Sequence, residues 1–215
     1  SASSSTFTNG SGELRNGSAI TSGTPTNHKW YEIAGQDSID FTTYGAPNNN
    51  VGTIFCMNHD SGSVPTLSAD DSLILINLSW SPYNSHALHI DSGALYIAHD
   101  ATGSPGANGS YMYLKSASDL TSDLVVGRTY KLTCDAKVGS GDSVNVVVND
   151  TNTTTSTAVT STSYVEVSHT FIAGHATSCY FRAEGMGSGE EIWLDNISLK
   201  EVGFATGWTE ADAQP

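Results

Sequence analysis

Basic residues are scarce in this chain of 215 residues, which has 8 Lys and Arg against 22 Asp and Glu. The formal net charge is −14 at pH 7. A surface that binds DNA or RNA needs a basic patch to neutralise phosphates, so the composition argues against nucleic acid as a partner. The acidity is instead compatible with neutral ligands and with divalent cations.

Cysteines and long apolar runs are also few. The three cysteines are Cys56, Cys134 and Cys179, and no CxxC pair occurs, so a zinc site is not expected. Cys134 and Cys179 stand at apolar positions of alternating segments. We expect buried free thiols there, with a disulfide as the alternative. Because no run of about 20 apolar residues exists, no membrane span is predicted.

Segments with the period of a helix are missing, whereas 21 glycines and many Ser, Thr and Asn residues separate short Val-, Ile- and Tyr-rich runs. This pattern predicts an all-β fold, an antiparallel β-sandwich of the jelly-roll type. We predict four parts. They are a flexible arm that mediates assembly (1–24), a small β module (25–76), the jelly-roll sandwich (77–202) and a tail (203–215).

Strict alternation assigns inward faces to the strands of the sandwich. The inward residues predicted in this way are Tyr130, Leu132, Cys134, Ala136, Val138, Val144, Val146, Val148, Val165, Val167, Phe171, Cys179, Phe181 and Ala183. In the closing segment "EIWLDNISLKEV" (191–202), alternation puts Trp193, Ile197 and Leu199 on one face. The same alternation places Asp195 on that apolar face, where a carboxylate needs a partner.

Three stretches of the sandwich segment resemble the jelly-roll carbohydrate-binding modules that are appended to bacterial and phage proteins. They are "SGALYIAHD" (92–100), "VGRTYKLTCDAKVGSG" (126–141) and the closing segment. In those modules the Asp of the closing strand often belongs to a structural calcium site. The resemblance therefore implies calcium at Asp195, with Asn77, Asp91 and Asp100 as further ligands. The alternative is that backbone amides bind the Asp195 carboxylate.

The segment 30–55 resembles a small β unit of virion and tail proteins of tailed phages. The matching residues are Asp40, Phe41, Thr42, Gly45, Ala46, Asn50, Val51, Gly52, Thr53 and Phe55. The resemblance implies a virion protein exposed on the outside of a particle. Its partners would be other virion subunits, and the chain itself would form a homo-oligomer such as a trimer.

Outward-facing aromatic and polar residues suggest a binding face. Sugar rings stack on aromatic side chains while polar groups bind the hydroxyls. The candidates are Tyr111, Tyr113, Tyr180, Arg182, Glu184 and Asn145. The same residue types are common in protein–protein contacts, so a cell-surface glycan, a partner subunit and plain solvent all remain open for this face.

Catalytic patterns are lacking: HExxH, GxSxG and GxxxxGK[ST] do not occur. Glu190 and Glu191 are adjacent in a strand and so point to opposite faces, while Asp70 and Asp71 lie in a turn-like stretch. We therefore predict a non-enzymatic virion structural protein that adheres weakly to glycans. The alternatives are a secreted carbohydrate-binding module and a subunit of an extracellular filament or surface layer.

Overall fold

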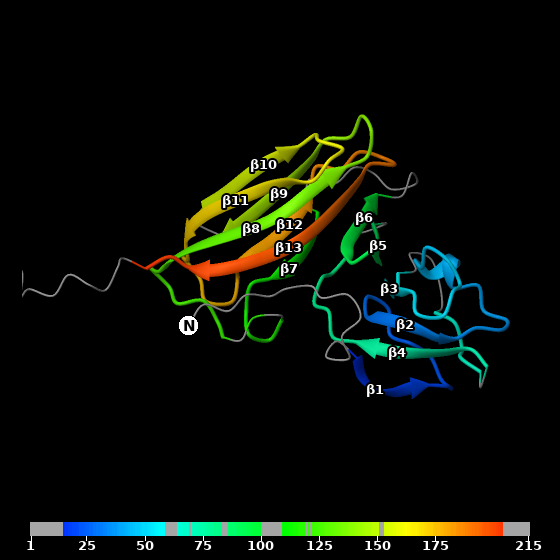
Figure 1. The fold of residues 1–215 in the computed structure, drawn as a ribbon. Coiled ribbons are helices and arrows are strands. Elements are labelled where there is room, and N and C mark those ends of the chain that lie inside the picture. The colour runs from blue at the N-terminus through cyan, green and yellow to red at the C-terminus, as the bar shows by residue number, and fades with distance from the viewer. Residues whose placement is uncertain are drawn as a thin grey trace, which may run out of the picture.

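The computed structural model describes residues 15–58, 64–68, 70–82, 86–99, 109–118, 120, 122–150 and 153–203. These residues form an all-β protein (Figure 1). The strands are β1 (Arg15–Ile20), β2 (Trp30–Gly35), β3 (Ile54–Cys56), β4 (Ser72–Ile76), β5 (His86–Asp91), β6 (Ala94–His99), β7 (Ser110–Tyr113), β8 (Thr129–Val138), β9 (Val144–Asp150), β10 (Thr153–Val159), β11 (Val165–Ile172), β12 (Tyr180–Glu184) and β13 (Glu191–Glu201). One 3₁₀ turn, η1 (Phe41–Tyr44), accompanies them. No helix in the described part is long and apolar enough to span a membrane.

The strands form two antiparallel sheets. The large sheet has the order β1-β4-β2-β3-β5-β6-β13-β8-β11, and the small sheet has the order β10-β9-β12-β7. Inward residues of both sheets, such as Leu132 and Leu194 from one and Val146 and Phe181 from the other, make one hydrophobic core. The predicted β-sandwich is thus confirmed, with β6, β13, β8 and β11 as the part of the large sheet that faces the small one (Figure 1).

Most inward positions follow the predicted alternation, with exceptions in β11 and in β13. In β8 the alternation holds along the whole strand. Val165 is wrong, because its side chain is 41% exposed at the start of β11. Further along β11, His169 takes an inward position, with its Nε2 3.1 Å from the carbonyl oxygen of Val146. The prediction of buried free thiols is confirmed for Cys134 and Cys179.

The closing strand β13 contains a β-bulge that corrects its predicted face. Asp195 is opposite Asp135 on β8, and Ser198 is opposite Thr133, so β13 has one extra residue there. Asn196, within this insertion, adopts a left-handed conformation (φ 49°), which is found in one type of β-bulge. The alternation therefore changes phase in mid-strand. The buried residues are Ile192, Leu194, Ile197 and Leu199, whereas Trp193 and Asp195 face outward.

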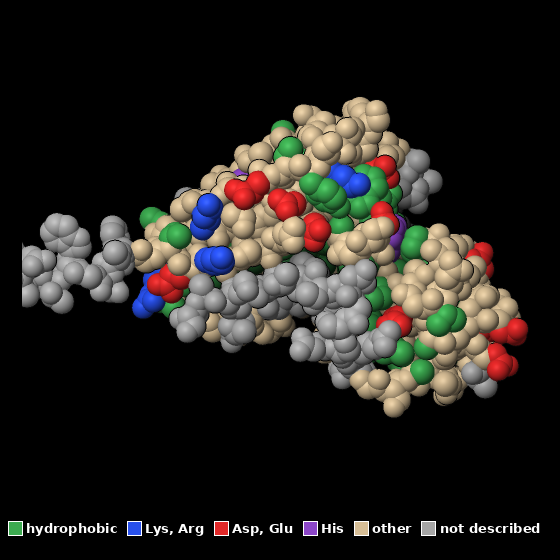
Figure 2. All heavy atoms as spheres, in the orientation of Figure 1, with side chains coloured by type: hydrophobic (Ala, Val, Ile, Leu, Met, Phe, Trp, Pro, Cys, Tyr) green, Lys and Arg blue, Asp and Glu red, His purple; other side chains and the backbone are tan. Residues whose placement is uncertain are grey.

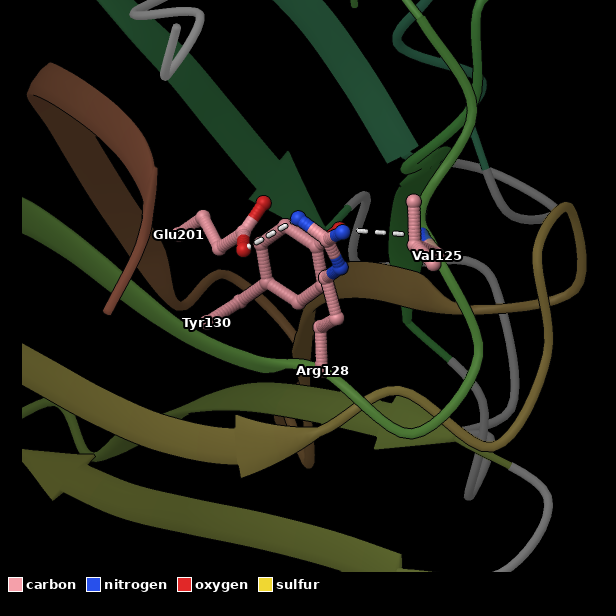
Figure 3. Close-up of polar contacts among 4 residues, drawn as sticks. All are labelled: Val125, Arg128, Tyr130 and Glu201. Atoms are coloured by element: carbon pink, nitrogen blue, oxygen red, sulfur yellow. Dashed lines mark hydrogen bonds and ion pairs between the residues drawn. The ribbon is translucent and has the colours of Figure 1, made fainter. Parts of the chain in front are cut away.

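Two polar contacts lie at the start of β8 and the end of β13 (Figure 3). A guanidinium nitrogen of Arg128, just before β8, lies 2.7 Å from a carboxylate oxygen of Glu201 at the end of β13. The hydroxyl of Tyr130 accepts a hydrogen bond of 2.9 Å from the backbone N–H of Val125. The close-up shows these groups together where β13 ends beside the start of β8.

One buried carboxylate organises the unit formed by β1 to β4. Asp71 accepts hydrogen bonds from the backbone N–H groups of Asp37, Ser38 and Ile39 at 2.7–3.1 Å. The hydroxyls of Ser38 and Ser68 also donate to it. Burial alone would raise the pKa of Asp71, but these donors outweigh burial and hold the pKa well below its ordinary value. Asp71 thereby fixes the loop after β2.

The residues of the phage-like pattern make the turn around η1. The carboxylate of Asp40 caps the turn by accepting from the Thr42 N–H at 3.1 Å. The Asn49 side chain donates to Asp40 and accepts from the Phe41 N–H at 2.7 Å. Gly45 ends the turn at φ 98°, a conformation that glycine adopts without strain. The pattern therefore describes a local loop structure, and it holds Phe41 in the core of this unit.

The small unit and the sandwich share a sheet and part of a core. The indole Nε1 of Trp30 donates to the carbonyl oxygen of Trp80 at 2.7 Å, and both rings belong to the sandwich core. Phe55 of β3 pairs with His89 of β5. Of the predicted arm, residues 15–20 form β1 against β4, while 1–14 lie outside the described residues, as does the tail from 204 onward. The domain boundaries stay a prediction.

Candidate binding site

Three tyrosines form a cluster on the outward face of the small sheet, which we call the tyrosine patch: Tyr111, Tyr113 and Tyr180. Tyr113 on β7 is directly opposite Tyr180 on β12. The ring centroids of these two lie 4.5 Å apart, and Tyr111 lies 5.6 Å from Tyr113 and 5.7 Å from Tyr180. All three side chains are partly exposed. Alternation within two neighbouring strands is enough to bring them together.

Charged and polar side chains border the tyrosine patch. Arg182 is opposite Tyr111, and its Nε lies 2.7 Å from Oε2 of Glu184 in an ion pair without hydrogen-bond alignment. The ammonium of Lys115 stands 4.3 Å from the centre of the Tyr113 ring. A hydrogen bond with the Tyr113 hydroxyl, followed by burial, raises the pKa of Tyr180.

Asn145 completes the set of sequence-predicted binding residues. It lies on β9 opposite Glu184, on the same outward face. The structure thus places all six predicted residues on one face of three adjacent strands. Aromatic rings beside hydrogen-bonding groups are the chemistry with which proteins bind sugars, and also a chemistry common in protein interfaces.

The predicted calcium ligands have separate partners. Asp195 accepts from the Asn196 N–H at 2.7 Å, and the Asn196 side chain donates to Asp135 at 2.7 Å. Asp91 accepts from Trp193 Nε1 at 2.8 Å. Asn77 follows β4, which four strands separate from β13 in the sheet order.

Asp100, the fourth predicted ligand, lies outside the described residues. Within the described ranges, no group of three or more His, Cys, Asp or Glu side chains could hold a metal ion. The contact between Asp195 and a backbone amide corresponds to the alternative considered for this residue. Calcium itself stays a prediction.

Three of the four acidic residues considered for catalysis have structural partners among the described residues. Glu190 accepts from the backbone N–H groups of Ser143 and Gly187. Glu191 accepts from the Tyr96 hydroxyl at 2.5 Å. Asp71 fixes the loop described above. These contacts explain the carboxylates as fold-stabilising groups.

An outward aromatic row on the large sheet was missed by the sequence reasoning. His89 on β5 packs against Tyr96 of β6 with tilted rings and a centroid distance of 4.3 Å, and Tyr96 contacts Trp193 of β13 at 5.0 Å. Lys137 of β8 stands 4.6 Å from the Trp193 ring centre and 5.0 Å from that of Tyr164. The signal was present as alternation in β6, but Trp193 had been assigned to the core face.

No protein-family model matches the chain, and a search of curated proteins gives no match. Among solved structures, the chain is similar to a xylan-binding domain, CBM22-1, from Paenibacillus barcinonensis. The identity is 14%, the match covers 59% of this chain and 88% of that domain, and the TM-score is 0.44. The N-terminal cellulose-binding domain of a β-1,4-glucanase from Cellulomonas fimi has 23% identity over 54% of this chain and 85% of its own, at a TM-score of 0.39. At these scores the likeness is partial, and the fold assignment rests on the strands and sheets described above.

Proposed function

We propose that this chain is a non-catalytic module that binds neutral glycans through the tyrosine patch. The observation that carries the proposal is the close set of Tyr111, Tyr113 and Tyr180 rings, partly exposed on one face of the small sheet. The apolar face of a pyranose ring stacks on such side chains. Arg182 and Glu184 neutralise each other beside the rings and still offer hydrogen bonds, which suits an uncharged polyol.

The setting proposed for this module is the exterior of a phage particle, and it rests on the sequence resemblance of residues 30–55. Many copies on one particle would turn a weak contact with a cell-surface glycan into useful avidity. A secreted carbohydrate-binding module would use the same surface. The test below therefore addresses the binding surface in either setting.

The decisive variant is the double substitution Tyr111→Ala with Tyr180→Ala. It removes two stacking surfaces, which should weaken the free energy of binding by at least about 1.4 kcal/mol. Since that amount corresponds to a tenfold loss of affinity, retention on an array of neutral glycans is expected to fall at least about tenfold. The matched control is Tyr111→Phe with Tyr180→Phe, which keeps both rings and should keep most of the retention. Thermal melting checks that both variants are folded.

A wild-type protein that is retained on no glycan, or a double Ala variant that is retained as well as the wild type, would overturn the proposal. Light scattering on the same samples tests the alternative role of the patch, as a contact between subunits. If the wild type is an oligomer and the double Ala variant is a monomer, the patch is a contact between virion subunits and not a glycan surface.

A further inference from the structure

A pocket lies on the large sheet, away from the tyrosine patch. It is a cavity of about 370 Å³ between residues 47–54 of the small unit and the end of β5, including His89, Asp91 and Ser92. Pockets that bind small molecules have volumes of about 300–1,000 Å³. The lining joins the two units of the chain, so this pocket exists only because β3 and β5 are neighbours in one sheet.

His89 lines this pocket. Its Nδ1 is buried, and the described residues offer it no hydrogen-bond partner. Burial lowers the pKa of His89 to about 4, and the nearby Asp91 opposes this only in part. At neutral pH the ring is therefore uncharged, and it offers no positive charge to an anionic ligand.

Asp91 supplies a fixed acceptor next to His89. Its Oδ2 accepts from Trp193 Nε1 at 2.8 Å, and its Oδ1 accepts from the Ser92 hydroxyl at 3.0 Å. These two donors hold the carboxylate in place without using all of its lone pairs, because a carboxylate accepts about four hydrogen bonds. An acceptor that is already oriented can bind a sugar hydroxyl at little cost in side-chain entropy.

The aromatic row His89, Tyr96 and Trp193 begins at the pocket and continues over the sheet. Figure 2 shows hydrophobic side chains gathered with a basic and several acidic side chains on this face, where β8 and β13 approach β6. The acidic side chains on the outward positions include Asp135, Asp195 and Glu191. Their negative field disfavours an anionic ligand.

We infer that this pocket and the adjoining aromatic row form a second saccharide-binding site, which takes a neutral pyranose beside the His89 ring with its hydroxyls on Asp91. The site does not depend on the tyrosine patch, which lies on the other sheet. Two sites on opposite faces would let one molecule cross-link two glycan chains.

The test is NMR of the folded full chain labelled with ¹⁵N, titrated with cellohexaose, xylohexaose or mannohexaose. At least one of these probes is expected to shift the His89 imidazole and Trp193 indole signals. The variant Val51→Trp fills the mouth of the pocket at a residue that is 66% exposed, so the fold should tolerate it, and the shifts should be lost. Val51→Thr, which keeps the volume, should retain them.

The double variant Tyr111→Ala with Tyr180→Ala should keep the His89 shifts, which separates this site from the proposed function. The inference is overturned if no probe moves the His89 and Trp193 signals of the wild type, or if Val51→Trp leaves the shifts unchanged. It is also overturned if tetramethylammonium chloride moves these signals and the sugars do not, since the site would then bind cations.

Discussion

The unit of residues 15–76 and the sandwich are stabilised in different ways. The sandwich has a continuous core to which both sheets contribute long alternating strands, whereas the small unit has a core of few residues around Phe41 and Phe55. The small unit relies in addition on Asp71, which organises a whole loop by itself. A small core buries too little apolar surface to fix its loops, so buried polar anchors take that role.

The largest effect on this comparison is expected from Asp71→Ala. The substitution leaves the backbone N–H groups of Asp37, Ser38 and Ile39 without their acceptor, and it should lower the free energy of unfolding by at least about 3 kcal/mol. Urea unfolding measures the loss, and hydrogen exchange should locate it in residues 30–58. Asp70→Ala, at the exposed neighbour, is the control, with an expected effect below about 0.5 kcal/mol. An equal loss in both variants would contradict the anchoring role.

Lowering the pH should have the next largest effect, and it should act on the sandwich before it acts on the small unit. Burial, and then the neighbouring His99, lower the pKa of His86 to about 4, and burial lowers that of His89 to about 4. The ordinary value is 6.5, so between pH 6.5 and 4 the unfolded chain binds more protons than the folded one. Stability is therefore complete above pH 6.5 and falls as the pH drops through this window, by up to about 3 kcal/mol for His86.

The contribution of Asp71 to stability should persist to a lower pH than that of His86. Its folded pKa is depressed, so its contribution is present above its ordinary value of 3.8 and disappears only at lower pH. Urea unfolding at pH 7, 5.5 and 4.5 should show falling stability in the wild type, and a smaller fall in His86→Phe. His28→Gln, at an exposed site, is the control and should keep the wild-type dependence. A flat profile in the wild type would contradict the buried neutral histidines.

The smallest effect is expected at the ion pair of Arg128 and Glu201. The Arg128 side chain is 56% exposed, so water and salt screen the attraction. Arg128→Ala should cost less than about 0.5 kcal/mol and shift Tm by less than about 2 °C. Glu201→Gln should have the same small effect. A Tm shift above about 5 °C in calorimetry would show that this end of the sandwich contributes more than its contacts indicate.

The sequence was sufficient for features that depend on one strand or on two neighbours. Alternation in β8 and β12 is a local property, so their inward faces and the outward tyrosines could be predicted. The all-β fold follows from the same patterns. Val165 was assigned wrongly because alternation does not say where a strand leaves the cover of the opposite sheet.

Features set by register or by distant loops could not be predicted. The aromatic row needs β5, β6 and β13 side by side with a definite pairing, and Trp193 points outward only because of the bulge. The role of Asp71 depends on a loop more than 30 residues earlier in the chain. No short segment contains that information.

The bulge at Asn196 adds one residue to β13 and so changes which residue numbers face the core. Ahead of it the even-numbered residues Ile192 and Leu194 face the core, and beyond it the odd-numbered Ile197 and Leu199 do so. Each half of the strand is in phase only because one residue separates them. Deleting Asn196 would restore simple alternation and turn the core-facing side chains of one half of the strand to the outer face. The length of this segment is therefore as strictly determined as its composition.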